Sequence, residues 1–301
     1  RKIGEGGMGV VYEARQSFLG RQVAVKFLGP EHRDGAFAAH FHREARLLAE
    51  MKHANIVACY QADFTPDGDC YLVMEYIDGP NLRQWIEQHG ALSMRTALVL
   101  CRELAQALQH AFDVGVAHHA SGIIHRDVKP ENVLLARNPK AASEDPFPFV
   151  VKLADLGLAR PSSRGPEQVN LTQHGAAVGT PATMAPEQYD DPEHVDFRAD
   201  IYGLGCVLYQ ALTGEAAFQG ATVSAILTQK LAPFGPDPRK HVPALPKGVS
   251  AFVKRMLARD RALRPASYAE LIVELDRLIA VSGAALAGKR RTRIAALAVG
   301  A

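Results

Sequence analysis

The stretch I-I-H-R-D-V-K-P-E-N-V-L-L, residues 123–135, is the most informative part of the sequence. It places an acid, a base and an amide at fixed offsets between two apolar runs, as Asp127, Lys129 and Asn132. This pattern predicts a loop that buried strands brace on both sides, with its polar tips facing a site. Asp127 can accept a proton, Lys129 can neutralise a phosphate, and Asn132 can bind a hard cation through its carbonyl oxygen.

A glycine-rich hairpin is predicted near the start of the chain, where residues 3–11 read I-G-E-G-G-M-G-V-V and fit the pattern G-x-G-x-x-G-x-V. Glycine lets a hairpin backbone approach phosphate oxygens and donate N–H groups with no Cβ in the way. A plain turn in any hairpin can carry the same glycines, so this motif alone leaves both interpretations open. A dinucleotide-binding fold needs a helix directly after the glycines, whereas residues 10–14 read as a strand.

The 123–135 stretch is the catalytic-loop signature of protein kinases, and the glycine-rich hairpin precedes it in the order that this family requires. The chain therefore resembles the Ser/Thr protein kinases, in particular the bacterial kinases of eukaryotic type. The resemblance implies an α+β, bilobal protein-kinase-like fold. A small lobe with an antiparallel β-sheet and a helix C would occupy residues 1–76, and a large, mainly α-helical lobe would occupy residues 77–280.

Two charged residues of the small lobe have roles in this family. Residues 22–28 alternate as a strand, on which a lone lysine is usually solvated. Lys26 follows the glycine-rich hairpin at the spacing of the family's V-A-I-K motif, so the resemblance makes it the ligand of the α/β-phosphates. Residues 36–52 read as helix C, whose Glu44 would pair with Lys26. The alternative is that Glu44 pairs with a neighbouring arginine on the surface.

The resemblance also outlines an adenine pocket next to a hinge at residues 75–79. Met74 would be the gatekeeper, and the backbone of Glu75 and Ile77 would meet the adenine edge. Each pocket residue could instead belong to a plain core, and only their joint placement favours a nucleotide site. The other residues that would surround the nucleotide are Ile3, Gly4, Gly6, Gly9, Val11, Ala24 and Leu134.

In the large lobe the resemblance assigns the chemistry. Asp127 would orient the substrate hydroxyl and accept its proton, Lys129 would contact the γ-phosphate, and Asn132 would hold a second Mg²⁺. A lysine at this position is typical of Ser/Thr kinases and is usually absent from tyrosine kinases. Residues 155–157 read D-L-G in place of D-F-G, so Asp155 would bind the Mg²⁺ that bridges the β- and γ-phosphates. Leu156 is the one notable departure, an apolar swap that still packs beside helix C.

Residues 158–187 resemble the activation segment, which ends in A-P-E. Arg126, beside the catalytic aspartate, implies control by phosphorylation because a guanidinium binds a phosphate in bidentate fashion. The candidate phosphosites are Thr172 first and then Ser162 or Ser163. The alternative is that these are solvated hydroxyl groups.

Four residues have supporting roles in the family. Thr180 would bridge Asp127 and Lys129. Asp200 would hold the backbone of the catalytic loop from a buried helix. The resemblance also pairs Glu187 with Arg264. A buried carboxylate or guanidinium is costly without its partner, so this is a scaffold role.

Two insertions and a tail depart from the core pattern. Residues 116–121 read as an insertion loop, and its two adjacent histidines do not predict a metal site because they do not face each other and lack nearby Cys or carboxylate partners. Residues 136–149 read as a surface insertion. In the tail, residues 281–301, a basic run precedes the apolar residues 294–301. This predicts either the clipped start of a transmembrane helix or a disordered tail, since a span needs about 20 residues.

Composition limits the alternatives. The 301 residues are 48% hydrophobic and 22% charged with a net charge of +2, which gives no global field for nucleic acid or an acidic polymer. No signal peptide opens the chain, and we expect an excised segment because it begins at Arg1 inside a motif. The cysteines are widely spaced, so we expect them to be reduced and structural. They are Cys59, Cys70, Cys101 and Cys206.

The sequence therefore predicts a Ser/Thr protein kinase that transfers the ATP γ-phosphoryl group to protein hydroxyls, including its own. It would use ATP with Mg²⁺ or Mn²⁺, bind protein substrates and no nucleic acid, and form a homodimer during activation. We expect a cytoplasmic catalytic domain of a membrane-anchored bacterial protein. The alternatives are a catalytically weak or pseudokinase-type nucleotide-binding scaffold and a small-molecule kinase.

Overall fold

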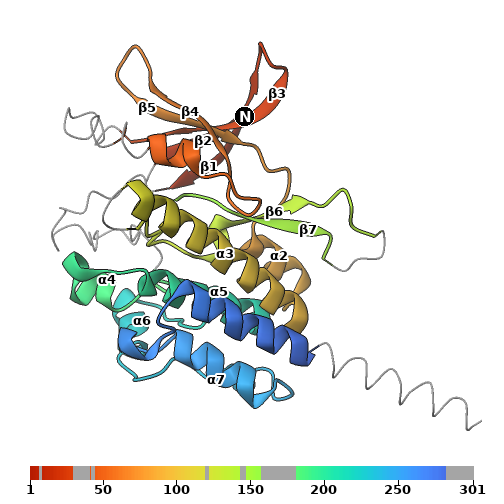
Figure 1. Cartoon of the computed structure of the whole chain (residues 1–301), viewed down its shortest axis with the longest axis vertical. Coiled ribbons are helices and arrows are strands. Elements are labelled where there is room, and N and C mark those ends of the chain that lie inside the picture. Colours follow the sequence, from red (N-terminus) through yellow and green to blue (C-terminus); the bar gives the residue numbers. More distant parts are fainter. Residues whose placement is uncertain are drawn as a thin grey trace, which may run out of the picture.

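The computed structural model describes residues 1–6, 9–29, 41, 45–118, 122–142, 147–156 and 181–282. Figure 1 shows a β-sheet at one end of the molecule and a group of helices at the other. The β-hairpin of β6 (Val133–Arg137) and β7 (Phe149–Leu153) lies between them. This is the predicted α+β arrangement of a small sheet and a larger helical part.

The sheet contains five antiparallel strands in the order β1-β2-β3-β5-β4. The centre of the sheet is β3, and both of its faces are covered, since Val23 on one face and Lys26 on the other are both buried. The bounds are β1 Lys2–Gly6, β2 Gly9–Gln16, β3 Arg21–Phe27, β4 Cys59–Phe64 and β5 Cys70–Glu75.

The helical part is built around two helices that contact each other, α3 (Met94–His118) and α5 (Arg198–Thr213). Nearly all of α5 is buried, so its apolar residues surround the helix instead of forming one stripe. The other helices are α2 Leu82–His89, α4 Glu187–Asp190, α6 Val223–Gln229, α7 Lys247–Met256 and residues 268–282. Short 3-10 turns lie at η2 Pro130–Asn132, η4 Pro192–His194, η5 Pro238–Lys240 and η6 Arg261–Leu263.

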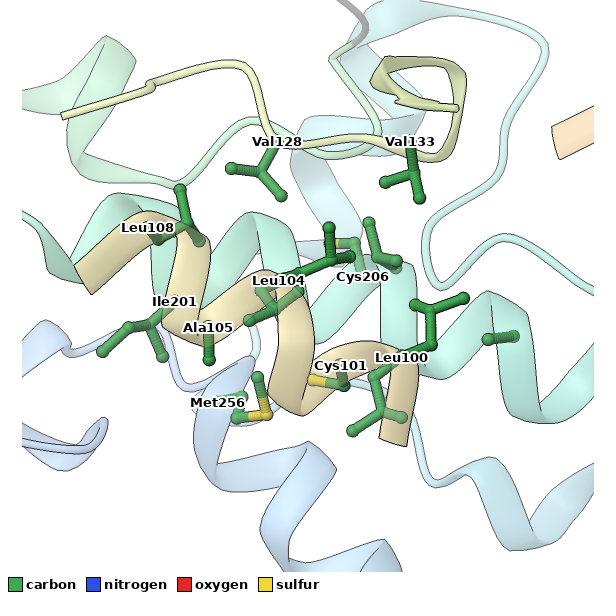
Figure 2. Close-up of a cluster of buried hydrophobic side chains, with 14 of the residues drawn as sticks. Leu100, Cys101, Leu104, Ala105, Leu108, Val128, Val133, Ile201, Cys206 and Met256 are labelled. Carbon is green, nitrogen blue, oxygen red and sulfur yellow. The ribbon is translucent and has the colours of Figure 1, made fainter. Parts of the chain in front are cut away.

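Apolar residues of the 123–135 stretch anchor it on this core. Figure 2 shows Val128 and Val133 pointing from the loop into a cluster with Leu104 and Cys206. Gly203 of α5 allows the close approach, because a Cβ there would lie 2.8 Å from the Val128 carbonyl oxygen. The packing of the two valines on the hydrophobic core therefore fixes the position of the polar residues between them.

The β6–β7 hairpin hydrogen-bonds to segments on both sides of it. Val57 donates its N–H to the Leu153 carbonyl at 2.9 Å, and Leu153 donates to the Asn55 carbonyl at 2.8 Å. On the hinge side, Leu135 donates to the Pro80 carbonyl at 3.0 Å. The hairpin thus joins the residues that precede β4, the residues that follow β5, and the 123–135 stretch.

Several predicted boundaries are wrong. Residues 123–124 lie in no strand, so only β6 flanks the 123–135 loop as a strand. The predicted loop at 116–121 begins later, because α3 continues to His118, and residues 119–121 lie outside the described part. The helix predicted at residues 36–52 ends at residue 50, and the last helix, residues 268–282, runs two residues into the predicted tail at 281–301.

Other expectations concern absences. All four cysteines are free thiols. Within the described residues no helix combines the length and apolar character that crossing a membrane requires. Residues 283–301, on which the prediction of a basic tail rests, lie outside the described part.

Candidate active site

A buried carboxylate fixes the backbone at the start of the catalytic loop. Asp200 of α5 accepts the N–H groups of His125 at 2.8 Å and Arg126 at 2.7 Å, and the hydroxyl of Tyr268 at 3.0 Å. Arg126 has a φ of 63°, a left-handed conformation that costs free energy in any residue except glycine. Burial raises the pKa of Asp200, and the charge of His125 and the hydrogen bonds oppose that rise. These three donors hold the strained loop in one conformation.

Two polar residues of the loop, Lys129 and Asn132, both donate hydrogen bonds to the third, Asp127. Lys129 Nζ donates to Asp127 Oδ2 at 2.8 Å. Asn132 Nδ2 donates to the Asp127 carbonyl at 2.9 Å and to Asp127 Oδ2 at 3.2 Å. Asn132 thus binds the loop through its side-chain nitrogen, which leaves its side-chain oxygen, Oδ1, for other partners.

A second carboxylate, Asp155, follows β7 and reaches the sheet. Lys26 Nζ donates to Asp155 Oδ1 at 2.8 Å, and Ala154 donates its N–H to the Asn132 carbonyl at 2.8 Å. Burial opposes ionisation of Asp155, but the charge and hydrogen bond of Lys26, with smaller contributions from His125 and Lys129, lower its pKa. The carboxylate is therefore ionised at neutral pH.

The donor set fits a hard cation. Within the described residues, neither Asn132 Oδ1 nor Asp155 Oδ2 accepts a hydrogen bond. Carboxylate and amide oxygens are ligands that Mg²⁺ accepts, and Mg²⁺ keeps several further oxygens from water and phosphate. No group of three or more His, Cys, Asp or Glu side chains in that part of the chain could hold a metal. A cation bound here would therefore take most of its ligands from a phosphate and water.

The glycine-rich hairpin and its neighbours form one continuous surface of the sheet. Gly4 pairs with Val11, Val11 with Lys26, and Ala24 with Met74. Gly9 has a φ of 129°, and a Cβ there would clash with the Phe27 carbonyl, so this position requires glycine. Ile3 is exposed at 42% and Gly6 is also exposed, which leaves them open to a ligand.

The hinge follows β5. Glu75 donates its N–H to the Ala58 carbonyl at 2.8 Å, and its side chain pairs with Lys152 of β7 at 2.8 Å. Among the described residues, none accepts a hydrogen bond from the Ile77 N–H, which is half-buried. Leu134 of β6 pairs with Asn81 beyond the hinge. The structure thus joins the hinge to the β6–β7 hairpin at the level of the predicted adenine pocket.

The segment after residue 180 is tied to the helical part and to the catalytic loop. Glu187 forms a bidentate ion pair with Arg264 at 2.5 and 2.8 Å, and both side chains are buried. Gln188 Nε2 donates to the Arg126 carbonyl at 2.8 Å. The predicted Glu187–Arg264 pair is present, and Gln188 adds a link to the loop that the sequence did not indicate.

Some predicted residues are not among those that the structure describes. Their predicted roles, the helix C glutamate, the phosphosites and the threonine that bridges the loop, lie outside the described residues. They are Glu44, Ser162, Ser163, Thr172 and Thr180.

Sequence reasoning missed Tyr268 and Lys152, which support the site from distant positions. Only the three-dimensional fold brings Tyr268 to Asp200 and Lys152 to Glu75. It also missed the partner of His118, whose Nε2 lies 2.6 Å from Glu50 Oε2. The expectation that no carboxylate lies near His118 was therefore wrong, although the pair alone does not make a metal site.

Comparisons with known proteins agree with this geometry. Residues 1–274 match the protein kinase domain family. The probable serine/threonine-protein kinase PknB of Bifidobacterium longum is 36% identical over 91% of this chain and 38% of its own length. The serine/threonine-protein kinase PknB of Mycolicibacterium smegmatis is 38% identical over 92% of this chain and 42% of its own length.

A solved structure shares the fold. The kinase domain of Mycobacterium tuberculosis PknI has a TM-score of 0.66 and 26% identity, covering 92% of this chain and 94% of that one. The chain spans about two fifths of the length of the curated relatives described above. The match over residues 1–274, together with the arrangement of Lys26, Asp127 and Asp155, leads to one conclusion: the chain belongs to the protein kinase domain family.

Proposed function

We propose that this chain is an ATP-dependent serine/threonine protein kinase domain, which transfers the γ-phosphoryl group of ATP to protein hydroxyls. One observation carries the proposal. Asn132 donates to Asp127, its backbone accepts from the residue before Asp155, and Asp155 pairs with Lys26. The acid, the metal-ligating groups and the phosphate-binding lysine therefore belong to one connected network.

Each residue would act by position and charge. Phosphoryl transfer needs alignment and neutralisation of charge more than covalent participation. Asp127 would hold the substrate hydroxyl and accept its proton as the new P–O bond forms. Lys129, 2.8 Å from Asp127, would neutralise the γ-phosphate. Lys26 would hold the α- and β-phosphates.

A bound divalent cation would neutralise the charge that develops on the β- and γ-phosphate oxygens. Asp155 and Asn132 would hold it, and we infer Mg²⁺ with Mn²⁺ as an alternative. Asp155 suits this role because its lowered pKa keeps it ionised.

The acceptor class rests on Lys129 and on the relatives. The K-P-E-N continuation, residues 129–132, separates the chain from small-molecule kinases, and the curated relatives are serine/threonine-protein kinases. We further propose autophosphorylation of the segment 158–187, a small lobe at 1–76, a large lobe at 77–280, and a tail at 281–301 that leads to a membrane anchor on the cytoplasmic side. A homodimer during activation is part of the same proposal.

The test is incorporation of labelled phosphate from ATP into a mixture of Ser- and Thr-containing peptides. Asp127→Asn should abolish incorporation and keep nucleotide binding. Phosphoamino-acid analysis should find phosphoserine or phosphothreonine. Undiminished incorporation in Asp127→Asn would refute the role of this residue, and nucleotide binding without any turnover in the wild type would favour the scaffold alternative.

A further inference from the structure

Gln188 of α4 holds the peptide group that leads into Asp127. Its Nε2 donates to the Arg126 carbonyl at 2.8 Å, and this carbonyl belongs to the peptide bond between Arg126 and Asp127. The N–H of the same peptide bond donates to His125 Nδ1 at 3.3 Å. Both polar atoms of this peptide group therefore have a side-chain partner, and together the two partners fix its orientation.

Arg126 needs such support because its backbone is strained. Its φ of 63° is a left-handed conformation, which persists only where the surroundings hold it. Asp200 Oδ1 accepts the N–H of Arg126 at 2.7 Å, so it fixes the peptide group before this residue, and Gln188 helps to fix the one after it. Without the bond from Gln188, relief of the strain would turn the second peptide group and displace Asp127 with it.

The other side of Asp127 is held by different means. Figure 2 shows that Val128, the next residue, packs into the hydrophobic core. The side chain of Asp127 accepts hydrogen bonds from Lys129 and Asn132, which belong to the same loop. Gln188 therefore holds the preceding side of Asp127 from outside the 123–135 loop.

Gln188 also has a capping contact, which gives it an alternative role. Its Oε1 accepts the Ala185 N–H at 2.9 Å, as a Gln or Glu side chain does at the start of many helices. A residue that only capped α4 would need this acceptor and not the donor. The two ends of the amide can be tested separately, because a carboxylate keeps the acceptor and loses the donor.

We propose that Gln188 is a positioning residue for phosphoryl transfer. Its donor fixes the peptide group before Asp127 and so keeps the carboxylate aligned with the substrate hydroxyl. This inference rests on the proposed kinase function. It concerns the rate of the chemical step and not the binding of ATP, because among the described residues Gln188 bonds to neither Lys26 nor Asp155. Alignment matters here, since a displacement of about 1 Å can lower a rate about a hundredfold.

Gln188→Glu separates the donor from the cap. The carboxylate still accepts the Ala185 N–H, but it cannot donate to the Arg126 carbonyl and repels it. With saturating ATP and a peptide that the wild type phosphorylates, kcat should fall about tenfold or more. The KM for ATP and the KM for the peptide should each stay within about twofold. Gln188→Met, which keeps the length without charge or donor, gives the same kcat test if the carboxylate destabilises the fold.

Protonation of the new carboxylate should restore the donor. A neutral carboxylic acid carries one O–H, and a half-buried position beside a carbonyl favours this form. The kcat of Gln188→Glu relative to the wild type should therefore rise as pH falls from about 8 to about 5.5, whereas that of Gln188→Met should stay constant. The ratio to the wild type removes the titration of His125, Glu187 and the other groups that all variants share.

Gln106→Glu is the matched control, since Gln106 is exposed on α3, and it should match the wild type at every pH. All assays are run at a temperature at which circular dichroism shows each variant to be folded. The inference would be overturned, with the kinase function intact, by an unchanged kcat in Gln188→Glu or by a deficit that does not shrink at low pH. A rise in either KM without a fall in kcat would also overturn it. A wild type that transfers no phosphate to any peptide would instead refute the proposed function.

Discussion

Lys26 Nζ donates to Asp155 Oδ1 at 2.8 Å, which joins the central strand of the sheet to the residues after β7. The two residues are 129 positions apart. Lys26 pairs with Val11 of β2, and Asp155 follows Ala154, whose N–H donates to the Asn132 carbonyl. Because Lys26 is almost fully buried and Asp155 is partly exposed, the lysine depends on this carboxylate more than the carboxylate depends on it. The pair is therefore the natural place to perturb the site.

Lys26→Met should abolish phosphoryl transfer and change the acid stability of the chain. Lys26 lowers the pKa of Asp155 against the opposing effect of burial. Since the folded pKa lies below the unfolded value, the pair stabilises the fold above the ordinary carboxyl range and loses this contribution as pH falls through the folded pKa. Urea unfolding between pH 7 and pH 3, about the range of carboxyl titration, should show a smaller acid-dependent loss in the variant. An identical acid profile and normal turnover would contradict the assignment.

Tyr268→Phe should lower both stability and turnover. The phenol donates to Asp200, which also accepts the N–H groups of His125 and Arg126. A hydrogen bond to a charged acceptor is worth roughly 1.5–3 kcal/mol, and its loss should loosen the strained backbone at Arg126. Denaturant unfolding and kcat measure the two effects. Tyr60→Phe, at an exposed tyrosine of β4, is the control and should behave as wild type.

Arg264→Met should destabilise the helical part strongly. Removing the guanidinium leaves Glu187 as a buried carboxylate without its partner, which typically costs about 3–5 kcal/mol. Arg277→Met removes an exposed arginine that pairs with Glu274 three residues earlier, and should lower the stability far less. Equal unfolding midpoints for the two variants would show that the buried Glu187 pair contributes no more to stability than the exposed pair.

Because Lys230 is buried, we expect the stability of the fold to change with pH under alkaline conditions. Its pKa is lowered by burial from 10.5 to about 8. Between these values the unfolded chain binds a proton that the folded chain has released, so stability rises with pH. Relative to Lys230→Met, the wild type should gain up to about 3 kcal/mol between pH 7.5 and pH 10.5. Parallel urea titrations would measure this, and a constant difference between the two proteins would exclude the shift.

The sequence predicted what local spacing determines. The offsets within residues 123–135 bring Asp127, Lys129 and Asn132 together without any information about the rest of the fold. The order of motifs indicated the family resemblance, and this resemblance predicted the sheet, the helical part and the pair of Glu187 with Arg264. Periodicity alone does not predict such long-range contacts.

What the sequence did not predict depends on tertiary contacts. The predicted loop at 116–121 begins too early, because α3 continues to His118. A Cβ at Gly115 would clash with the backbone of Ile123, so this glycine serves close packing inside the helix. Residues 123–124 are apolar enough for a strand but pair with none of the strands that the structure describes. Asp200 organises the backbone that follows them instead.

The hydrogen bonds that tie residues 55 and 57 to Leu153 have a consequence for motion. Leu153 ends β7, the strand that leads to Asp155. Residues 55 and 57 therefore cannot move away from the helical part without breaking their hydrogen bonds to β7. If the proposed nucleotide site opens while these hydrogen bonds are kept, the sheet would tilt about residues 55–57. The glycine-rich hairpin lies at the opposite edge of the sheet from β4. It would therefore move furthest, while residues 55 and 57 stay in place.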